Sequence, residues 1–489
     1  MASDHPSVTA TNVELSPSAT PGYTHANGLT GESAKKASEL LTANHALYHT
    51  RWSALGFHIY HMDPLLMSTS DQITHHLLAL WALGASPEQI QEMFDYNTPY
   101  QVSMRQPDGI GAAHVDMVDT VVFDECLGKN EFYKDYLQYF ENEITKKGMK
   151  AVVKQYVLKG DERANDIFCR MFTDMGAAMI HLGCGLEFQQ SSVVAEALAS
   201  ACVHDDWPKS VLLPTEEFVR SNVKTPTKPL LQVLESLRSD PVVAAGVKAS
   251  DPFNKIRDGL LKRVPKDHLV PYLSQFQVKS EAQDLEQKLG DMMQTCAYMT
   301  GAAQQPDKLE AIDYVLLHSV TLSVHYAAIL ALDWLSDDEK ARLLEAKGRM
   351  DALTYAGCGS PRLHPERISA YVPKYPNHGW PELFQRAVVY RDEGHVAKLI
   401  RSLYALEQLD ETTMMPELPI RKPDFVKIAH MVLDSTERLA NSNSSMLPDK
   451  VADAIASQVG LGGEMVVNNR KRWVFYCGLD QAWQFFPDL

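Results

Sequence analysis

The stretch VVYRDEGHVAKLIRSL, Val388–Leu403, has the apolar spacing of a helix and places a histidine and a lysine on it. The face centred on His395 carries Val388, Asp392, Lys398, Leu399, Ser402 and Leu403. Lys398 therefore lies on an apolar stripe. No acidic residue lies three or four positions away, where it would form an ion pair with a solvated lysine. The spacing is compatible with a snorkelling lysine beside a core histidine, or with two functional side chains.

The composition is typical of a globular protein. The chain has 489 residues, of which 45% are hydrophobic, enough for two or three domains or for one large helical domain. Its formal net charge is −16 and it has no cluster of Lys and Arg, which argues against nucleic acid and anionic membrane surfaces as partners. A neutral or weakly acidic small molecule is the expected ligand.

The cysteines and the apolar segments indicate a cytoplasmic protein. Seven scattered cysteines without a Cys-x-x-Cys pair argue against a disulfide framework and a zinc finger. The N-terminal stretch has no secretory signal; it is rich in Ser, Thr and Pro, so residues 1–35 are predicted to form a disordered tail. The most apolar segment, Val315–Leu335, is interrupted by His318 and His325, which predicts a buried helix rather than a membrane span.

Helical signals recur along the chain, and few stretches alternate apolar and polar residues as strands do. Gly84 is a predicted helix stop, and Ser86 and Ser336 each begin a predicted capping box. Repeated prolines across residues 207–271 predict a lid or a subdomain joint. We therefore predict a mainly α fold, a large multi-helix bundle with little or no sheet, in which residues 36–489 form one domain.

Three further helices present histidines on apolar faces. His75 is followed at helical spacing by small alanines that leave room beside the imidazole, whereas His76 shares its face with leucines, so we favour His75 as the functional residue. His181 lies close to Gly183 and Gly185, which would let another backbone or a ligand approach.

The third of these helices carries His318 and His325. They lie seven residues apart, about 10 Å along a helix, too far for both to bind one metal ion comfortably. One histidine from each of several helices could form a buried metal site between the helices, because neutral imidazole binds iron, zinc and copper. Each histidine alone could equally be a hydrogen-bonded core residue.

Common catalytic motifs are missing from the sequence. It has no His-Glu-x-x-His, no Glu-x-x-His, no Walker A motif, no Gly-x-Ser-x-Gly and no complete dinucleotide-binding glycine motif. Two His-x-Asp triplets could begin a 2-His-1-carboxylate iron site, although such sites are usually carried on β-barrels. These triplets are His114/Asp116 and His204/Asp206. His181 and Cys184 could form a metal-binding pair, or Cys184 could be a small core residue.

Four stretches resemble, in the same order, the questin oxidase-like proteins of fungal aromatic-polyketide biosynthesis. They are HHLLALWALGAS (75–86), IHLGCGLEF (180–188), DDEKARLLEAKGRMD (337–351) and DEGHVAKLIRSL (392–403). The resemblance runs from about residue 40 to the C-terminus, and GHVAK is its most telling part. In the family, a compact Gly-Phe-His-Asn-His stretch almost abuts the double histidine, whereas here Gly56-Phe57-His58 lies well before it. The first ligand is therefore open between His58, His75 and His76.

The resemblance implies an oxygenase that opens an anthraquinone ring oxidatively, formally like a Baeyer–Villiger oxidation. It also implies a non-haem Fe(II) centre held by several histidines and a carboxylated lysine. Carried onto this chain, the implied ligands are His75, His181, His318, His395 and Lys398. His395 and Lys398 are the implied catalytic residues. A carboxylated Lys398 would be an anionic oxygen donor suited to iron, and burial would favour the neutral amine from which it forms.

Two other functions are compatible with the same residues. One is a metal-free Baeyer–Villiger-type monooxygenase of the same substrate class, with NADPH as reductant. The other is a non-catalytic helical carrier of polyketide intermediates, in which the histidines are packing residues. In the oxygenase, Glu187 or Asp392 could orient a ligand, or both could be solvated carboxylates.

Overall fold

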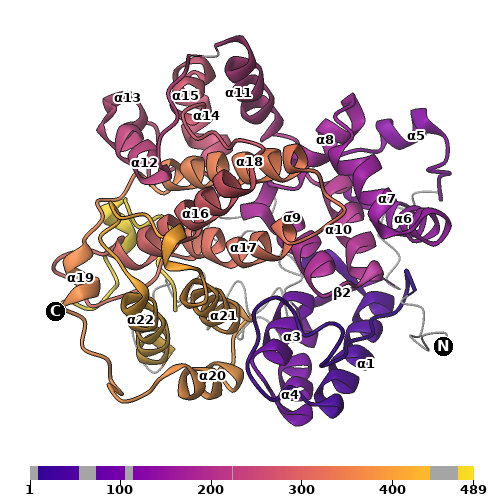
Figure 1. Cartoon of the computed structure of the whole chain (residues 1–489), viewed down its shortest axis with the longest axis horizontal. Helices are drawn as coiled ribbons and strands as arrows, with labels where there is room; N and C mark the ends of the chain where they lie inside the picture. The colour runs from indigo at the N-terminus through magenta and orange to yellow at the C-terminus, as the bar shows by residue number, and fades with distance from the viewer. Residues whose placement is uncertain (1–8, 54–72, 105–113, 223, 441–471) are drawn as a thin grey trace. The chain divides into compact units, whose positions relative to one another are not determined.

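The computed structural model describes residues 9–53, 73–104, 114–222, 224–440 and 472–489 (Figure 1). These residues are mainly helical, which confirms the predicted fold class, and the sheet they contain is one antiparallel pair of short strands. The chain divides into two compact units. Of the described residues, unit 1 contains 9–53, 73–104 and 114–208, and unit 2 contains 209–222, 224–440 and 472–489.

In unit 1, helix α10 packs against α9 and α6, and α1 packs against α3 and α4. Strands β1 and β2 pair with Tyr48 opposite Ser103 and Ser53 opposite Gln101. The elements are α1 (Gly31–Leu47), β1 (Tyr48–Ser53), α3 (Ile73–Ala82), α4 (Pro87–Asn97), η2 (Thr98–Tyr100), β2 (Gln101–Ser103), α5 (Thr120–Glu125), η3 (Asn130–Phe132), α6 (Tyr133–Lys147), α7 (Met149–Val153), η4 (Lys154–Leu158), α8 (Glu162–Arg170), α9 (Thr173–Glu187) and α10 (Ser191–Val203).

Local sequence signals set the helix ends around α3 and α4. Helix α3 ends at Ala82, and Gly84 follows in the left-handed region with φ of +83°. At the head of α4, Ser86 Oγ accepts a hydrogen bond from the Gln89 N–H, and Gln89 Oε1 accepts one from the Ser86 N–H. This is the predicted capping box, and it confirms the sequence-based start of the helix.

Gly185 allows α9 and α10 to approach closely. A Cβ atom at this position would lie 2.6 Å from Val194 Cγ2 and 2.9 Å from the Val194 backbone nitrogen. Only a glycine fits there, because real Cβ atoms do not approach other heavy atoms so closely. The expectation that a glycine beside His181 would let another backbone approach is therefore confirmed, and that backbone belongs to α10.

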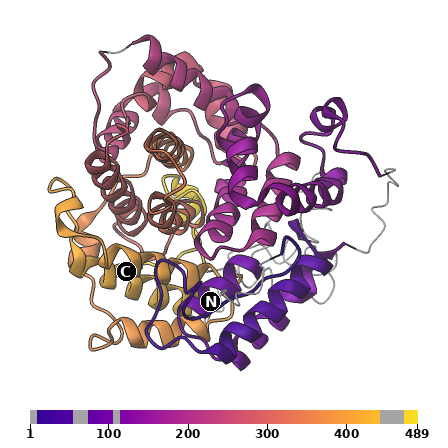
Figure 2. The same ribbon diagram turned by 45° about the vertical axis from the view of Figure 1, so that its right-hand side comes forward.

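In unit 2, helices α16, α17 and α18 pack on one another, α17 also packs on α21, and α21 packs on α20 and α22. Figures 1 and 2 show α21 and α22 side by side in the orange part of the chain. The elements are α11 (Lys209–Ser221), α12 (Leu230–Ser239), α13 (Pro241–Ala244), η5 (Ile256–Leu260), α14 (Leu261–Arg263), α15 (Lys266–Leu273), α16 (Ala282–Ala302), α17 (Tyr314–Leu330), α18 (Asp337–Gly357), α19 (Pro365–Ser369), α20 (Trp380–Val388), α21 (His395–Glu407), η6 (Glu411–Thr413), α22 (Lys422–Ala440) and η8 (Asp480–Trp483).

Helix α17 is the buried helix predicted from the most apolar segment of the sequence. Each of its residues from Tyr314 to Ile329 is buried. Asp313 caps its first turn, because Oδ1 accepts from the Val315 and Leu316 N–H groups. No helix among the described residues is both long and apolar enough to cross a membrane.

The prediction of one continuous helix over Val388–Leu403 is wrong. Helix α20 ends at Val388, and α21 begins at His395 after a loop. Gly394 stands at the start of α21 with φ of +87°, a conformation that suits glycine. Asp392 caps the new helix, since its carboxylate accepts from the Gly394 N–H at 2.7 Å and the Val396 N–H at 2.9 Å. Asp392 therefore precedes the helix that carries His395 and Lys398.

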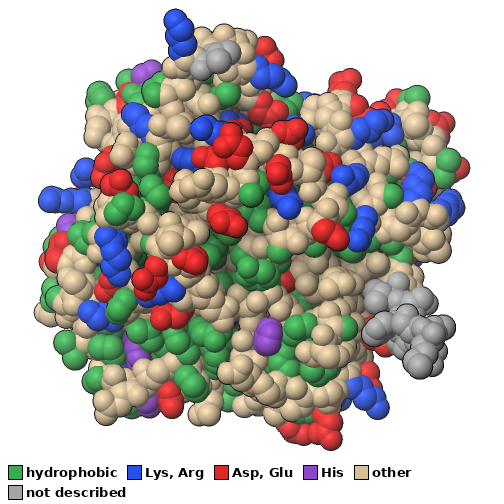
Figure 3. Space-filling view, viewed as in Figure 1, with side chains coloured by type: hydrophobic (Ala, Val, Ile, Leu, Met, Phe, Trp, Pro, Cys, Tyr) green, Lys and Arg blue, Asp and Glu red, His purple; other side chains and the backbone are tan. Residues whose placement is uncertain are grey.

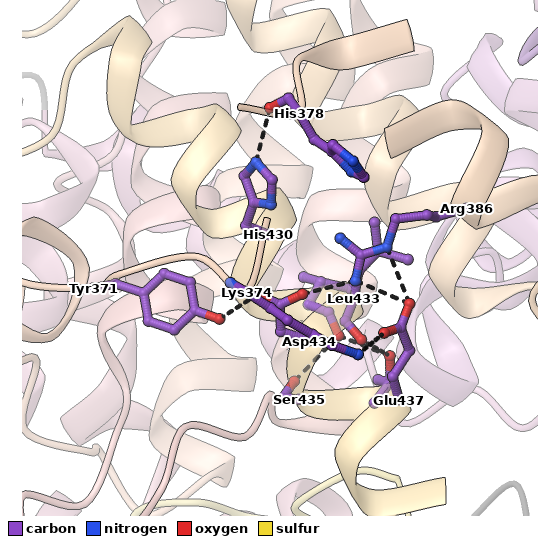
Figure 4. Close-up of polar contacts among 11 residues, drawn as sticks. Tyr371, Lys374, His378, Arg386, His430, Leu433, Asp434, Ser435 and Glu437 are labelled. Carbon is purple, nitrogen blue, oxygen red and sulfur yellow. Dashed lines mark hydrogen bonds and ion pairs between the residues drawn. The ribbon is translucent and has the colours of Figure 1, made fainter. Parts of the chain in front are cut away.

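A polar cluster joins α20 to α22 next to α21 (Figure 4). Arg386 of α20 donates hydrogen bonds to Asp434 at 2.7 Å and to Glu437 at 3.0 Å, both on α22. His430 of α22 donates from Nε2 to the backbone carbonyl of His378 at 3.0 Å. These contacts fix the two helices on which α21 packs, and so they support the helix that begins at His395.

The C-terminal segment lies against the start of α17. The Tyr314 N–H donates to the Val474 carbonyl at 2.7 Å, and the Val474 N–H donates to the Ile312 carbonyl at 3.0 Å. Asp313 Oδ2 accepts from the Cys477 N–H at 2.8 Å. Trp473 is thereby held as a buried side chain of unit 2.

The surface charges and the cysteines are arranged as expected from the sequence. On the face drawn in Figure 3, Lys and Arg side chains are interspersed with Asp and Glu. All seven cysteines are buried, and none of them forms a disulfide among the described residues. The expectation of no disulfide framework is confirmed for this part of the chain.

Candidate functional site

Unit 1 brings two of the predicted histidines together. His75 on α3 and His181 on α9 are both about 3% exposed, and His75 Nε2 lies 3.0 Å from His181 Nδ1. Their ring centroids are 4.9 Å apart. His76, the alternative to His75, instead accepts a hydrogen bond at Nδ1 from the Asn97 side chain at 3.4 Å. The side chain of His75 therefore faces α9.

A buried chain of carboxylates and imidazoles continues from this pair. His181 Nε2 donates to Glu196 Oε2 at 2.5 Å, and the other oxygen of Glu196 accepts from His45 Nδ1 at 2.7 Å. His45 Nε2 donates to Glu141 at 2.8 Å. The side chains of His45, Glu196 and His181 are almost inaccessible to solvent. The four residues come from α1, α6, α9 and α10.

The electrostatics of this chain keep its central ion pair charged. Burial alone would lower the pKa of His45, but its hydrogen bonds to Glu141 and Glu196 raise that pKa to about 10. Burial would raise the pKa of Glu196, but the hydrogen bonds from His181 and His45 lower it to about 2. At neutral pH Glu196 is a carboxylate and His45 an imidazolium.

Unit 2 brings the other predicted residues together on α17 and α21. The rings of His318 and His395 are T-shaped with centroids 5.1 Å apart. Lys398 lies one turn after His395 and is 6% exposed. Burial, and then the positive charge of Lys398, lower the pKa of His318 to about 3. His318 is therefore a neutral imidazole beside Lys398.

Backbone and aromatic groups orient the unit 2 pair. His318 Nδ1 donates to the Tyr314 carbonyl at 2.7 Å, which leaves the lone pair on Nε2. The Tyr314 ring lies 4.8 Å from the ring of His395 and 4.8 Å from that of Phe475, and Trp473 lies 6.2 Å from His395. These rings pack around His395, and the buried carboxylate of Glu393 lies 3.7 Å from its Nδ1.

The two residues of each His-x-Asp triplet have different partners in the structure. His114 Nδ1 donates to Asp135 at 2.7 Å, while Asp116 accepts from the Val118 N–H. His204 is fully buried and donates from Nδ1 to the Ser200 carbonyl, and its Nε2 lies 3.2 Å from Asp174.

Other sequence-based candidates lie apart from the two pairs or outside the described residues. His58 lies outside the described residues. His325 is buried two turns beyond His318 on α17, and Cys184 is a buried residue of α9. Among the residues that the structure describes, no three His, Cys, Asp or Glu side chains are arranged to hold a metal ion.

The alternative that Glu187 and Asp392 are solvated carboxylates is wrong, because both are buried. Glu187 Oε1 accepts from the Tyr23 backbone N–H at 2.8 Å, and so it binds the segment that precedes α1. Asp392 caps α21. Their partners are backbone N–H groups, which supply the hydrogen bonds that buried carboxylates require.

Sequence reasoning missed Glu196 and His45. Glu196 had a signal of its own, because it is the one charged residue of α10, SSVVAEALASACV, and a charge inside an apolar helix is expected to have a buried partner. His45 had a weaker signal, because it is one of several histidines in this part of the sequence. The sequence could not show that the two residues, 151 positions apart, share a hydrogen bond.

Comparisons with known proteins give a consistent assignment. A family model described as questin oxidase-like matches residues 69–403. The chain is 40% identical to Oxidoreductase AflY of Aspergillus parasiticus, over 98% of this chain and 94% of that protein. It is 31% identical to a questin oxidase of Aspergillus fumigatus, over 82% of this chain and 88% of that protein. It is 29% identical to the Baeyer-Villiger monooxygenase dmxR6 of a Cryptosporiopsis species, over 98% of this chain and 99% of that protein.

The family match covers more than half of the chain and includes the histidines of both pairs. The resemblance predicted from four short stretches is therefore confirmed over most of the sequence. The relatives carry the names of oxidoreductases, so this chain is an enzyme of that class. The chain belongs to the questin oxidase-like family.

Proposed function

We propose that this enzyme is a non-haem Fe(II)-dependent oxygenase that opens the ring of an anthraquinone-type aromatic polyketide. The proposed ligands are those that the family resemblance implies: His75, His181, His318, His395 and Lys398. The names of its relatives, a questin oxidase and a Baeyer-Villiger monooxygenase, support the reaction class. The observation that carries the proposal is that, inside each unit, the predicted ligands are neighbours: His75 with His181, and His318 with His395.

The unit 1 pair fits two ligands of one ion. Metal–nitrogen bonds of about 2.1 Å at right angles place two ligand nitrogens about 3.0 Å apart. His75 Nε2 and His181 Nδ1 are separated by that distance. Both side chains are buried, so a hydrogen bond between their nitrogens would be replaced by bonds to the ion without exposing either ring.

In unit 2, His318 and Lys398 are also suited to bind a metal ion. A histidine ligand usually donates its second ring N–H to a carbonyl or carboxylate, which fixes the tautomer. His318 does so through Nδ1 to the Tyr314 carbonyl, and burial, the larger cause of its low pKa, keeps Nε2 unprotonated. Lys398 is buried, which favours the uncharged amine that reacts with CO₂ to form a carboxylated lysine. Its carboxylate would be a hard oxygen donor that offsets the charge of the ion.

The residues of the chain have separable roles in this proposal. A bound ferrous ion would supply the redox chemistry that activates O₂. The buried histidines position that ion, and Tyr314 and Trp473 keep water away from the side of His395. Their flat rings are also suited to contact a planar polycyclic substrate.

The second candidate is a metal-free Baeyer–Villiger-type monooxygenase that uses NADPH to reduce the quinone. The name of the Cryptosporiopsis relative favours it. The two candidates differ in what the purified protein must contain. The iron enzyme needs bound metal whether or not NADPH is present, and the metal-free enzyme needs NADPH and no metal.

The deciding experiment combines metal analysis with turnover of a hydroxyanthraquinone. We expect stoichiometric iron, a ring-opened product, and loss of both in His395→Asn at an unchanged melting temperature. His430→Asn is the matched control, because His430 is also buried in unit 2 but donates to the His378 carbonyl and is not a proposed ligand. Full turnover by iron-free protein with NADPH would refute the iron proposal and support the second candidate.

A further inference from the structure

Glu196 is the buried carboxylate between two histidines of unit 1. It is 2% exposed, and each of its two oxygens accepts one hydrogen bond, from His181 Nε2 at 2.5 Å and from His45 Nδ1 at 2.7 Å. The close approach of α10 to α9 at Gly185 brings it within reach of His181. Its charge is compensated locally by His45, whose other nitrogen donates to Glu141.

The hydrogen bond to Glu196 decides which nitrogen of His181 carries the proton. A neutral imidazole has one N–H and one lone pair. A carboxylate can only accept a hydrogen bond, so Nε2 of His181 carries a proton, and in the neutral ring the lone pair is then on Nδ1. His75 Nε2 then donates a hydrogen bond to His181 Nδ1.

We propose that Glu196 is a positioning residue, which holds His181 as the Nε2–H tautomer and aims the Nδ1 lone pair at His75, and that His45 in turn holds Glu196. The tautomer assignment stands on the hydrogen bond from His181 Nε2 to Glu196 and on a neutral His181 ring. The further consequence, that this arrangement prepares Nδ1 to bind a metal ion, rests on the proposed iron-dependent function.

Glu196 is not itself placed as a ligand. Both of its oxygens are engaged by imidazole N–H groups, and it contacts the nitrogen of His181 on the other side of the ring from His75. A carboxylate behind a ligating histidine fixes the ring orientation and makes the imidazole more basic, and losing it typically costs about 10- to 100-fold in metal affinity.

Two substitutions of Glu196 separate this role from simple packing. Glu196→Met keeps the length and the apolar stem but removes the acceptor. Glu196→Gln keeps one oxygen, which can still accept from His181 while the amide N–H donates to a neutral His45. Asp166→Asn is the matched control, because Asp166 is a buried carboxylate of unit 1 paired with Arg170 at 2.7 Å.

The first readout is the ¹⁵N spectrum of histidine-labelled, metal-free protein, in which the His181 signals are identified by their loss in His181→Asn. We expect the Nε2–H pattern in the wild type, Glu196→Gln and Asp166→Asn, and a mixture of tautomers in Glu196→Met. A wild-type spectrum with the proton on Nδ1, or an unchanged tautomer in folded Glu196→Met, would overturn the proposal. The wild-type spectrum decides even where Glu196→Met does not fold.

The second readout is the affinity for Co(II), titrated by its visible absorption as a substitute for Fe(II). We expect about a 10- to 100-fold loss in Glu196→Met, a smaller loss in Glu196→Gln and none in Asp166→Asn. Equal affinities in all folded variants would overturn the metal-preparing role. A tautomer change in Glu196→Met together with no metal binding by the wild type would support the positioning role of Glu196 and refute the iron function.

Discussion

Lys398 is the residue whose chemical state matters most to its neighbours. As an ammonium group it lowers the pKa of His318, in addition to the effect of burial. As a carboxylated lysine it would carry a negative charge and act in the opposite direction. The protein contains another buried lysine, Lys347, which forms an ion pair with Asp351 at 2.5 Å and donates to the Ser319 carbonyl at 3.1 Å. The two lysines allow a direct comparison of a proposed ligand with a structural ion pair.

Lys398→Met is expected to abolish stoichiometric iron binding while the protein stays folded, because methionine fills the space of the lysine stem without offering an oxygen donor. Metal analysis and a melting curve measure the two effects. Lys347→Met is the control: it leaves Asp351 buried without its counter-ion, which costs about 3–5 kcal/mol of stability, and it does not change the iron content of the folded fraction. Stoichiometric iron in Lys398→Met would contradict the ligand assignment.

His45 gives the protein a stability that depends on pH. The pKa of His45 is raised from 6.5 to about 10 in the folded protein, so its contribution is complete below about pH 6.5 and is lost as the pH rises towards 10. The difference in unfolding free energy between the wild type and His45→Asn should therefore shrink across this range in urea titrations.

His430 should give the opposite pH dependence of stability in the same titrations. Burial lowers its pKa, so the unfolded chain takes up a proton more readily than the folded protein does, and the stability falls as the pH drops below about 6.5. The advantage of the wild type over His430→Asn should shrink towards acid pH, not towards alkaline pH. A His45→Asn difference that stays constant between about pH 6.5 and 10 would contradict the buried ion pair with Glu196.

At the scale of helices, sequence signals with a local cause were predictable. The capping boxes at Ser86 and Ser336 and the stop at Gly84 depend only on residues within one turn, and all three are present. The break before α21 was missed, because the apolar spacing continues across it. The Asp392-Glu393-Gly394 sequence holds the missing information: a capping carboxylate followed by a glycine that adopts a left-handed conformation.

Gly185→Ala tests the packing that brings Glu196 to His181. A Cβ atom there would overlap Val194, so α9 and α10 must separate, and we expect about 1–3 kcal/mol of destabilisation. Gly31→Ala is the matched control, because nothing lies within 4 Å of a Cβ atom at that position. Urea unfolding measures both variants. An equal, small effect of the two substitutions would contradict the close approach of the helices.

At the scale of the whole chain, composition and periodicity were sufficient to predict a mainly helical fold, because both reflect local propensity and burial, whereas the enzyme class came from the family resemblance. The neighbours of each histidine were not predictable. His75 and His181 are separated by 106 positions, and their contact depends on the packing of α3 and α9. The family resemblance, rather than spacing, selected the five proposed ligands from the histidines and lysines of the chain.

The most direct test of the iron-dependent function is a crystal structure of the purified protein, with anomalous data collected on both sides of the iron absorption edge. We expect an iron peak within bonding distance of His395 and Lys398, and electron density that continues beyond Lys398 Nζ as a carboxylate. An unmodified Lys398 with no anomalous peak beside His395, in protein that still opens the anthraquinone ring, would contradict the iron-dependent function.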